Sequence, residues 1–98
     1  MRVQWHPRIL NELLRARGHY NGCRPGLGDS FVDEFDQRIA AISEAPLQWA
    51  KVSGDVRRVL MRRFRYAIFY RVAGPELLLV LVLKHQRRHP KYGFNRRH

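Results

Sequence analysis

The first half of the chain changes from strand-like to helix-like spacing of its hydrophobic residues. Met1 to Trp5 alternates between polar and apolar positions, which predicts a short, half-buried strand. Pro7 then suits the first turn of a helix, because a backbone N–H has no intrahelical partner there. This helix is predicted to end at Gly18 and the following Asn-Gly pair, ahead of a breaker-rich loop over residues 21–28. Its expected buried face consists of Leu10, Leu13, Leu14 and Arg17, widened by Ile9 and Ala16.

A second helix is predicted to begin near Asp29 or Ser30, either of which can cap it, and to stop at Pro46. The Ser30-x-x-Asp33 spacing resembles a capping box, and the early acidic residues favour the positive end of the helix dipole. Two amphipathic helices joined by a short loop predict an antiparallel helical hairpin. The buried stripe of the second helix is expected to contain Phe31, Phe35, Ile39 and Ile42.

Beyond Gln48 the pattern takes the period of β-strands. Val56 to Arg63 alternates and is basic, and Arg65 to Val72 is rich in aromatic and β-branched residues. After a turn at residues 73–76, Leu77 to Leu83 is continuously apolar, as in a central strand covered on both faces. This order predicts an α+β fold: an N-terminal strand, then an antiparallel helical hairpin packed on a small, mainly antiparallel β-sheet.

The length and composition favour one small domain. We expect a single domain over residues 1–98, in which residues 85–98 form a basic C-terminal tail too polar for the core. The longest apolar run is much too short to span a membrane, so no membrane partner is expected. The N-terminus lacks the apolar stretch of a secretion signal, and a single cysteine excludes a disulfide within the chain. These features predict a cytoplasmic protein.

The net charge of +11 is distributed unevenly along the chain. Six of the eight acidic residues precede residue 50, whereas the chain beyond Val56 carries twelve Lys or Arg and one acid, Glu76. Such a field attracts polyanions, and contacts to phosphates would make binding strongly dependent on salt. Nucleic acid, a ribosome or an acidic protein segment are the partners that this asymmetry favours.

The basic strands suggest a binding surface. Alternation leaves an open sheet face carrying Arg58, Arg62, Arg65, Phe69 and Arg71, provided that the more apolar positions face the helices. Arginines around an aromatic ring suit single-stranded nucleic acid, because stacking contributes about 1–3 kcal/mol per base. Alternatively, Phe69 and the arginine stems only shield the sheet from water. The alternation alone does not decide which face is open.

The sequence contains no phosphate-binding glycine loop and no metal-binding spacing, so neither a cofactor nor a metal is expected. His85 and His89 lie four residues apart, but Pro90 directs His89 away from helical geometry. RNA cleavage by its own 2′-hydroxyl needs a base, an acid and cations on the phosphate. His85, His89 and the arginines can supply these groups without a metal, and Tyr92 can stack on a base.

Several motifs occur in an order that extends over nearly the whole chain. They are His6-Pro7, Tyr20, the run Leu27-Gly28-Asp29-Ser30-Phe31, Pro46, the segment Arg63 to Val72 and the closing His85-x-x-Arg88-x-Pro90. Together they resemble the RelE/ParE superfamily of bacterial toxins, including the plasmid-stabilisation toxins. The fold of that superfamily, a helical hairpin against a small antiparallel sheet, agrees with the pattern of this chain.

The resemblance implies the toxin of a type II toxin–antitoxin pair, which an antitoxin encoded beside it holds inactive. The C-terminal segment of such an antitoxin typically folds as it wraps the toxin. The basic charge of this chain suits an acidic antitoxin segment. A groove for the apolar side chains of that segment is expected along Leu10, Leu14 and the second helix.

The superfamily divides by target: RelE-like members cut mRNA in the ribosomal A site, and ParE-like members poison DNA gyrase. Of the basic positions of the ribonuclease branch, Arg58 fits one, while the apolar Leu60 and Ala67 stand at two others. Tyr92 fits the late tyrosine of that branch. An arginine stands near it, as Arg87 or Arg88.

Three functional hypotheses follow. The first, slightly favoured, is a ParE-like gyrase poison that uses the basic surface, including Arg87 and Arg88. The second is a RelE-like endoribonuclease that acts on mRNA in the ribosome, with His85, Arg88 and Tyr92 as its catalytic residues. The third is a non-toxic RNA-binding module.

Overall fold

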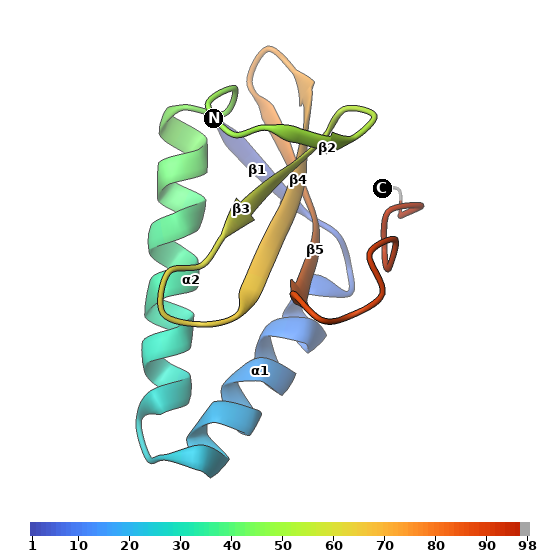
Figure 1. Ribbon diagram of the computed structural model, residues 1–98. Coiled ribbons are helices and arrows are strands. Elements are labelled where there is room, and N and C mark those ends of the chain that lie inside the picture. Colours follow the sequence, from blue (N-terminus) through green and yellow to red (C-terminus); the bar gives the residue numbers. More distant parts are fainter. Residues whose placement is uncertain (97–98) are drawn as a thin grey trace.

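The computed structural model describes residues 1–96. Two helices and five strands occur in this part of the chain (Figure 1), in the order β1 (Arg2–Trp5), α1 (Ile9–Cys23), α2 (Leu27–Glu44), β2 (Lys51–Ser53), β3 (Val56–Leu60), β4 (Tyr66–Gly74) and β5 (Leu77–His85). The strands form one sheet in the order β1-β5-β4-β3-β2. β1 runs parallel to β5 and the other neighbours are antiparallel, which confirms the predicted α+β fold with a mainly antiparallel sheet.

A bulge in β5 determines which residues of this strand face the helices. Phe69 of β4 pairs with Val82, but the next residue, Tyr70, pairs with Val80, so Leu81 is an extra residue. Side chains alternate along a strand, and one extra residue exchanges the two faces beyond it. Lys84 therefore lies on the sheet face away from the helices, where its amine sits over the ring of Phe69.

The helical hairpin covers one face of the sheet. The main core cluster joins helical residues to strand residues, among them Phe31, Phe35 and Ile42 of α2 and Ile68, Tyr70 and Val80 of the sheet. Phe31, Phe35 and Ile42 are buried as the periodicity predicts, and Ile39 packs at the edge of this cluster. The predicted stripe of α2 is therefore confirmed.

The buried face of α1 differs from the prediction. Ile9 and Ala16 are buried, with Leu13 and Tyr20 packed against the core, whereas Leu10 and Leu14 are 64% and 51% exposed. The inward line thus follows positions 9, 13, 16 and 20, a spacing of three to four residues that rotates Leu10 and Leu14 out of the interface. The sequence of α1 contains two overlapping apolar stripes. The stripe that packs on the sheet is the one through positions 9, 13, 16 and 20, not the one through Leu10 and Leu14.

The turn between the helices is shorter than predicted. α1 continues through Gly18 and Gly22 to Cys23, and α2 begins at Leu27 after Gly26, which has φ +84°. Neither Asp29 nor Ser30 caps α2; no side-chain cap is present, and Asp29 instead pairs with Arg17 of α1 at 2.9 Å. The helices approach closely because position 28 is glycine: a Cβ there would lie 2.1 Å from the Arg17 carbonyl oxygen.

The second sheet face is covered, not open as predicted. Its own apolar cluster contains Phe69, Leu79 and Leu81, and Tyr92 and Phe94 pack against it from the C-terminal segment, residues 86–96. Figure 1 shows this segment returning beside β5. The predicted tail is thus partly core-forming within residues 86–96, and residues 97–98 of that prediction lie outside the described part of the chain.

The basic strand predicted from Val56 to Arg63 ends earlier, at Leu60, and the loop after it is held by α2. The buried Glu34 carboxylate accepts hydrogen bonds from the backbone N–H groups of Arg62 and Arg63. Arg62 and Arg65 therefore lie in the β3–β4 loop and not on a strand. The short strand β2 was missed, because three residues are too few for a recognisable alternation.

We predict that Glu34→Gln lowers the free energy of unfolding by about 1–3 kcal/mol, because one loop N–H loses its buried acceptor. Urea unfolding of the purified chain measures this change. Asp33→Asn, at an exposed position of the same helix, is the matched control and should stay within about 0.5 kcal/mol of the original chain. Equal effects of the two substitutions would contradict the assigned role of Glu34.

Candidate functional site: a cationic pocket between α1 and the C-terminal segment

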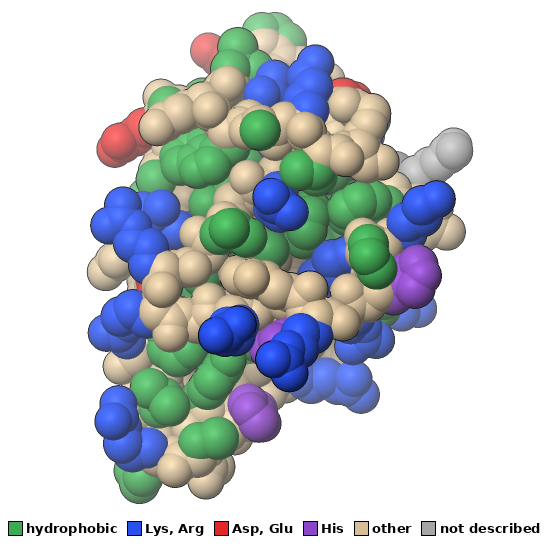
Figure 2. Space-filling model, viewed as in Figure 1, with side chains coloured by type: hydrophobic (Ala, Val, Ile, Leu, Met, Phe, Trp, Pro, Cys, Tyr) green, Lys and Arg blue, Asp and Glu red, His purple; other side chains and the backbone are tan. Residues whose placement is uncertain are grey.

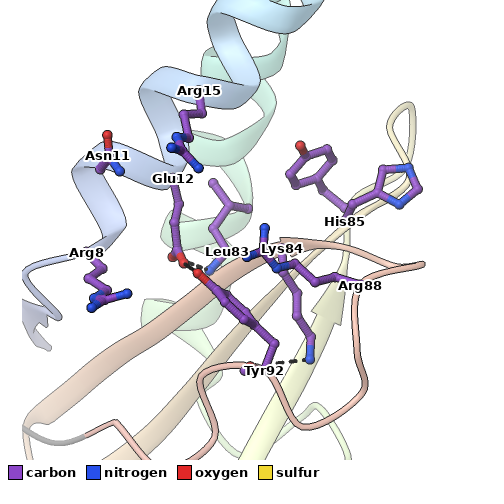
Figure 3. Close-up of a pocket in the computed structure, with 10 residues that line it drawn as sticks. Arg8, Asn11, Glu12, Arg15, Leu83, Lys84, His85, Arg88 and Tyr92 are labelled. Atoms are coloured by element: carbon purple, nitrogen blue, oxygen red, sulfur yellow. Dashed lines mark hydrogen bonds between the residues drawn. The ribbon is translucent and has the colours of Figure 1, made fainter.

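The three residues predicted as catalytic lie around one pocket. This pocket has a volume of about 320 Å³ and opens between α1, the end of β5 and the C-terminal segment (Figure 3). Its lining comprises Arg8, Asn11, Glu12, Arg15, Tyr66, Leu83, Lys84, His85, Arg88 and Tyr92. His85, Arg88 and Tyr92 are thus brought together, and four cationic side chains, Arg8, Arg15, Lys84 and Arg88, surround a single carboxylate.

Glu12 ties α1 to the far end of the chain. Its Oε1 accepts from the Leu83 N–H at 3.1 Å and from Arg96 Nη1 at 3.0 Å. Its Oε2 accepts from Arg96 Nη2 at 2.7 Å and from the Tyr92 hydroxyl at 3.0 Å. The side chains of Arg96 and Glu12 are only 7% and 11% exposed, so this bidentate ion pair is screened little by water. Burial alone would lower the pKa of Arg96, and Glu12 outweighs this effect and raises it.

Tyr92 in turn positions Arg88. The Arg88 guanidinium carbon lies 3.9 Å from the centre of the Tyr92 ring, a short cation–π distance. The Tyr92 hydroxyl is already engaged by Glu12, so the ring has a fixed orientation. Glu12, Tyr92 and Arg88 therefore form a chain of contacts from the partly buried carboxylate to an exposed cation at the pocket.

Lys84 fastens the C-terminal segment to the sheet from inside. This lysine is only 5% exposed, and its amine donates to the carbonyls of Pro90 at 2.7 Å and His89 at 3.0 Å. The amine also lies 4.8 Å and 4.5 Å from the ring centres of Phe69 and Phe94. Burial lowers the pKa of Lys84, and the positive charges of Arg88 and Arg96 lower it further.

The aromatic wall of the pocket contains Tyr66 and His85. Their rings meet edge to face at 5.4 Å, and His85 Nδ1 accepts the backbone N–H of Arg87 at 3.0 Å. This bond directs the other ring nitrogen of His85 away from the backbone. Burial raises the pKa of Tyr66, while the nearby Arg88 acts in the opposite direction.

A second pocket, of about 540 Å³, lies on the sheet face away from the helices. Arg58 and Arg88 line it together with Leu60, Ala67 and Phe69. Phe69 is only 4% exposed beneath Phe94 and Lys84, so it offers no open ring for stacking, contrary to the expectation of an exposed platform. The Lys84 amine therefore lies in this pocket beside the apolar residues Leu60, Ala67 and Phe69.

The other predicted basic residues do not join Arg58 and Arg88. Arg62 and Arg65 are exposed in the β3–β4 loop, and Arg87 is exposed in the C-terminal segment. Arg71 lines a different hollow and pairs weakly with Asp55, at 3.8 Å. Of the seven basic and aromatic positions predicted for target binding, Arg58, Phe69 and Arg88 share a pocket.

The contribution of α1 to the first pocket was not predicted from the sequence. Arg8, Asn11, Glu12 and Arg15 follow one another at intervals of one to three residues and lie along one side of the helix. The spacing of this polar stripe could have predicted a functional face of the helix. The partners of Glu12 could not have been predicted, because Tyr92 and Arg96 lie 80 and 84 residues away in the chain.

An apolar hollow lies on another side of α1. It has a volume of about 390 Å³ and is lined by Trp5, His6, Pro7, Ile9, Leu10, Leu13, Phe35 and Asp36. Trp5, Leu10 and Leu14 are among the exposed large hydrophobic residues of the chain. The predicted groove residue Leu10 therefore lines a hollow, and Leu14 stands one helical turn further along α1.

Positive charge dominates the visible surface. Figure 2 shows Lys and Arg side chains over much of this face, with acidic side chains mainly near its upper edge. Within residues 1–96, no three His, Cys, Asp or Glu side chains gather closely enough to hold a metal ion. No helix of the described chain has the length and apolar character that crossing a membrane requires.

Comparison with solved structures finds the same fold in a toxin–antitoxin protein. A chain described as "Chromosomal ParDE TA system from P. aeruginosa" superposes with a TM-score of 0.76 and 18% sequence identity, covering 87% of this chain and 95% of that chain. At this identity the likeness establishes the fold alone. A search of curated proteins found no match.

A family match carries the assignment further. The family described as "ParE toxin of type II toxin-antitoxin system, parDE" matches residues 3–90, which is most of the chain. This match confirms the resemblance to the RelE/ParE superfamily that the motifs indicated. A cognate antitoxin is the partner that such a toxin implies. The chain therefore belongs to the ParE toxin family of type II toxin–antitoxin systems.

Proposed function

We propose that this toxin inhibits bacterial growth in the ParE manner, by binding DNA gyrase, until its antitoxin covers it. The observation that carries the proposal is the presence of two apolar residues, Leu60 and Ala67, in the second pocket. Leu60 and Ala67 occupy positions where the ribonuclease branch has basic side chains, and both line this pocket. A cleaving enzyme needs cations around the scissile phosphate, but the Lys84 amine in this pocket is engaged by backbone carbonyls, which leaves Arg58 and Arg88 for that task. Membership of the ParE family supports the same reading.

The alternative is a RelE-like endoribonuclease that cuts mRNA in the ribosome. The meeting of His85, Arg88 and Tyr92 at one pocket favours it. Against it, the Tyr92 hydroxyl donates to Glu12 and the Tyr92 ring lies under Arg88, so neither is available to a substrate without rearrangement. In this alternative, His85 is the group that would move protons.

The gyrase proposal predicts dose-dependent inhibition of plasmid supercoiling by the purified toxin. Arg88→Gln should raise the half-inhibitory concentration about tenfold or more, because a charge-assisted contact is lost. Arg24→Gln is the matched control, since Arg24 is an exposed arginine in the turn between α1 and α2. It should inhibit like the original toxin.

A translating extract tests the alternative, cleavage of mRNA in the ribosome. The proposal predicts intact mRNA in the extract at toxin concentrations that stop supercoiling. The ribonuclease would instead be established if gyrase were unaffected at saturating toxin and mRNA were cut in the ribosomal A site. The His85→Ala variant should then leave the mRNA intact.

We propose further that the antitoxin's C-terminal segment binds along Leu10 and Leu14. These leucines are exposed on α1 beside the apolar hollow that includes Trp5. Burying an exposed leucine contributes about 1.5–3 kcal/mol, so two of them support a tight complex. An acidic segment would also be attracted to the net charge of +11.

The double substitution Leu10→Ser with Leu14→Ser should weaken antitoxin binding about tenfold or more and leave toxicity intact. Both positions are exposed, so the fold should tolerate the change. Leu47→Ser is the control, because Leu47 is 67% exposed and lies outside the hollow. Calorimetric titration with the cognate antitoxin measures the affinity. Equal affinity of the double variant and the control would refute the groove.

A further inference from the structure

Three guanidinium groups face the first pocket without a carboxylate to neutralise them. Figure 3 shows Arg15 extending from α1, Arg8 standing directly before this helix, and Arg88 on the opposite side, above Tyr92. The ion pairs among residues 1–96 join Arg17, Arg63, Arg71 and Arg96 to acids, and none involves these three. All three residues are exposed, so a ligand can reach them from solvent.

Glu12, the one acid among the described residues that line the pocket, does not cancel this charge. Glu12 stands four residues after Arg8 and three before Arg15, the spacings at which helical ion pairs form. Its carboxylate instead points inward, and both oxygens are engaged by Arg96, Tyr92 and the Leu83 N–H. Glu12 and Arg96 neutralise each other, and the charges of Arg8, Arg15 and Arg88 remain.

The positive potential of the pocket affects the pKa values of two neighbouring residues, Lys84 and Tyr66. Arg88 lowers the pKa of Lys84 beyond the effect of burial, and it acts to lower the pKa of Tyr66 as well. Lys84 adds a further positive charge beside the pocket, although its amine is turned to the backbone carbonyls of the C-terminal segment. An anion in the pocket would interact favourably with every one of these cations.

The arrangement of donors identifies the class of anion. Arg15 of α1, Arg8 directly before this helix and Arg88 of the C-terminal segment line the pocket, together with the Asn11 amide. A phosphomonoester dianion presents three terminal oxygens and about two negative charges, whereas a carboxylate has two oxygens and one charge. We propose that this pocket binds a phosphate dianion, either as inorganic phosphate or as the terminal phosphomonoester of a nucleotide.

The size of the pocket agrees with a small ligand. About 320 Å³ lies at the lower end of the range for small-molecule sites and holds a phosphate with part of a sugar. Because Arg88 also belongs to the proposed target surface, the inference rests on the proposed function and names the chemistry recognised there. Arg8 and Arg15, which were not among the binding residues predicted from the sequence, are assigned here to phosphate binding.

Titration of the full-length chain at constant ionic strength tests the proposal. The probes are inorganic phosphate, adenosine 5′-monophosphate, adenosine and acetate, followed by NMR of the backbone amides. Phosphate and the nucleotide should bind saturably, with shifts confined to residues 8–15 and 83–92, and adenosine and acetate should not. Tighter binding of the nucleotide than of phosphate would identify the nucleotide as the source, and equal binding would identify the free anion.

Arg15→Gln should weaken phosphate binding about tenfold, and Arg8→Gln should act in the same direction, because each removes a charged donor. Arg24→Gln, outside the pocket, should leave the affinity unchanged. Acetate binding as tightly as phosphate, or an equal loss in Arg24→Gln, would overturn the proposal. Because the readout is direct binding, a negative result leaves gyrase inhibition standing, and a failure of gyrase inhibition leaves phosphate binding measurable.

Discussion

The partly buried bidentate pair between Glu12 and Arg96 is the contact on which the cationic pocket depends. It joins the first helix to the last described residue of the chain, and the same carboxylate accepts from Leu83 of β5 and from Tyr92. Removing one partner of such a pair leaves a buried charge uncompensated, at a cost of about 3–5 kcal/mol. The same Glu12 carboxylate holds the Tyr92 hydroxyl, and the Tyr92 ring lies 3.9 Å from the Arg88 guanidinium carbon. The pocket is therefore a consequence of this tie between distant segments.

α1 separates two surfaces of different chemistry. Leu10 and Leu14 are exposed beside the apolar hollow, and Arg8 and Arg15 face the cationic pocket. A helix can present both, because residues one position apart are rotated by about 100° around its axis. An antitoxin segment bound along the leucines, as proposed, would lie next to the arginines and would cover part of the proposed target surface.

Local sequence patterns predicted where the helices and strands lie better than they predicted which face of each element is buried. Phe31, Phe35 and Ile42 recur at helical spacing with no competing stripe, so both the helix and its buried side followed from the sequence. In α1 two stripes overlapped, and only packing on the sheet decided between them. The face of Lys84 depends on the bulge at Leu81, which no spacing in a continuously apolar run can reveal.

The site was predictable only in part for a related reason. His85, Arg88 and Tyr92 lie close in the sequence, so proximity in the chain brought them to one pocket. The role of Glu12 required knowing that the C-terminal segment folds back over the sheet. That segment was read as a polar tail, since its few apolar residues, Tyr92 and Phe94, show no periodicity.

A double-mutant cycle between Glu12 and Arg96 tests the central claim most directly, because it isolates their mutual interaction from the cost of each substitution. Glu12→Gln, Arg96→Gln and the double variant are unfolded in urea beside the original chain. The account predicts a coupling free energy of about 1–3 kcal/mol, with the double variant less destabilised than the sum of the singles. Strictly additive losses of unfolding free energy would show that the two side chains do not hold α1 to the C-terminal segment.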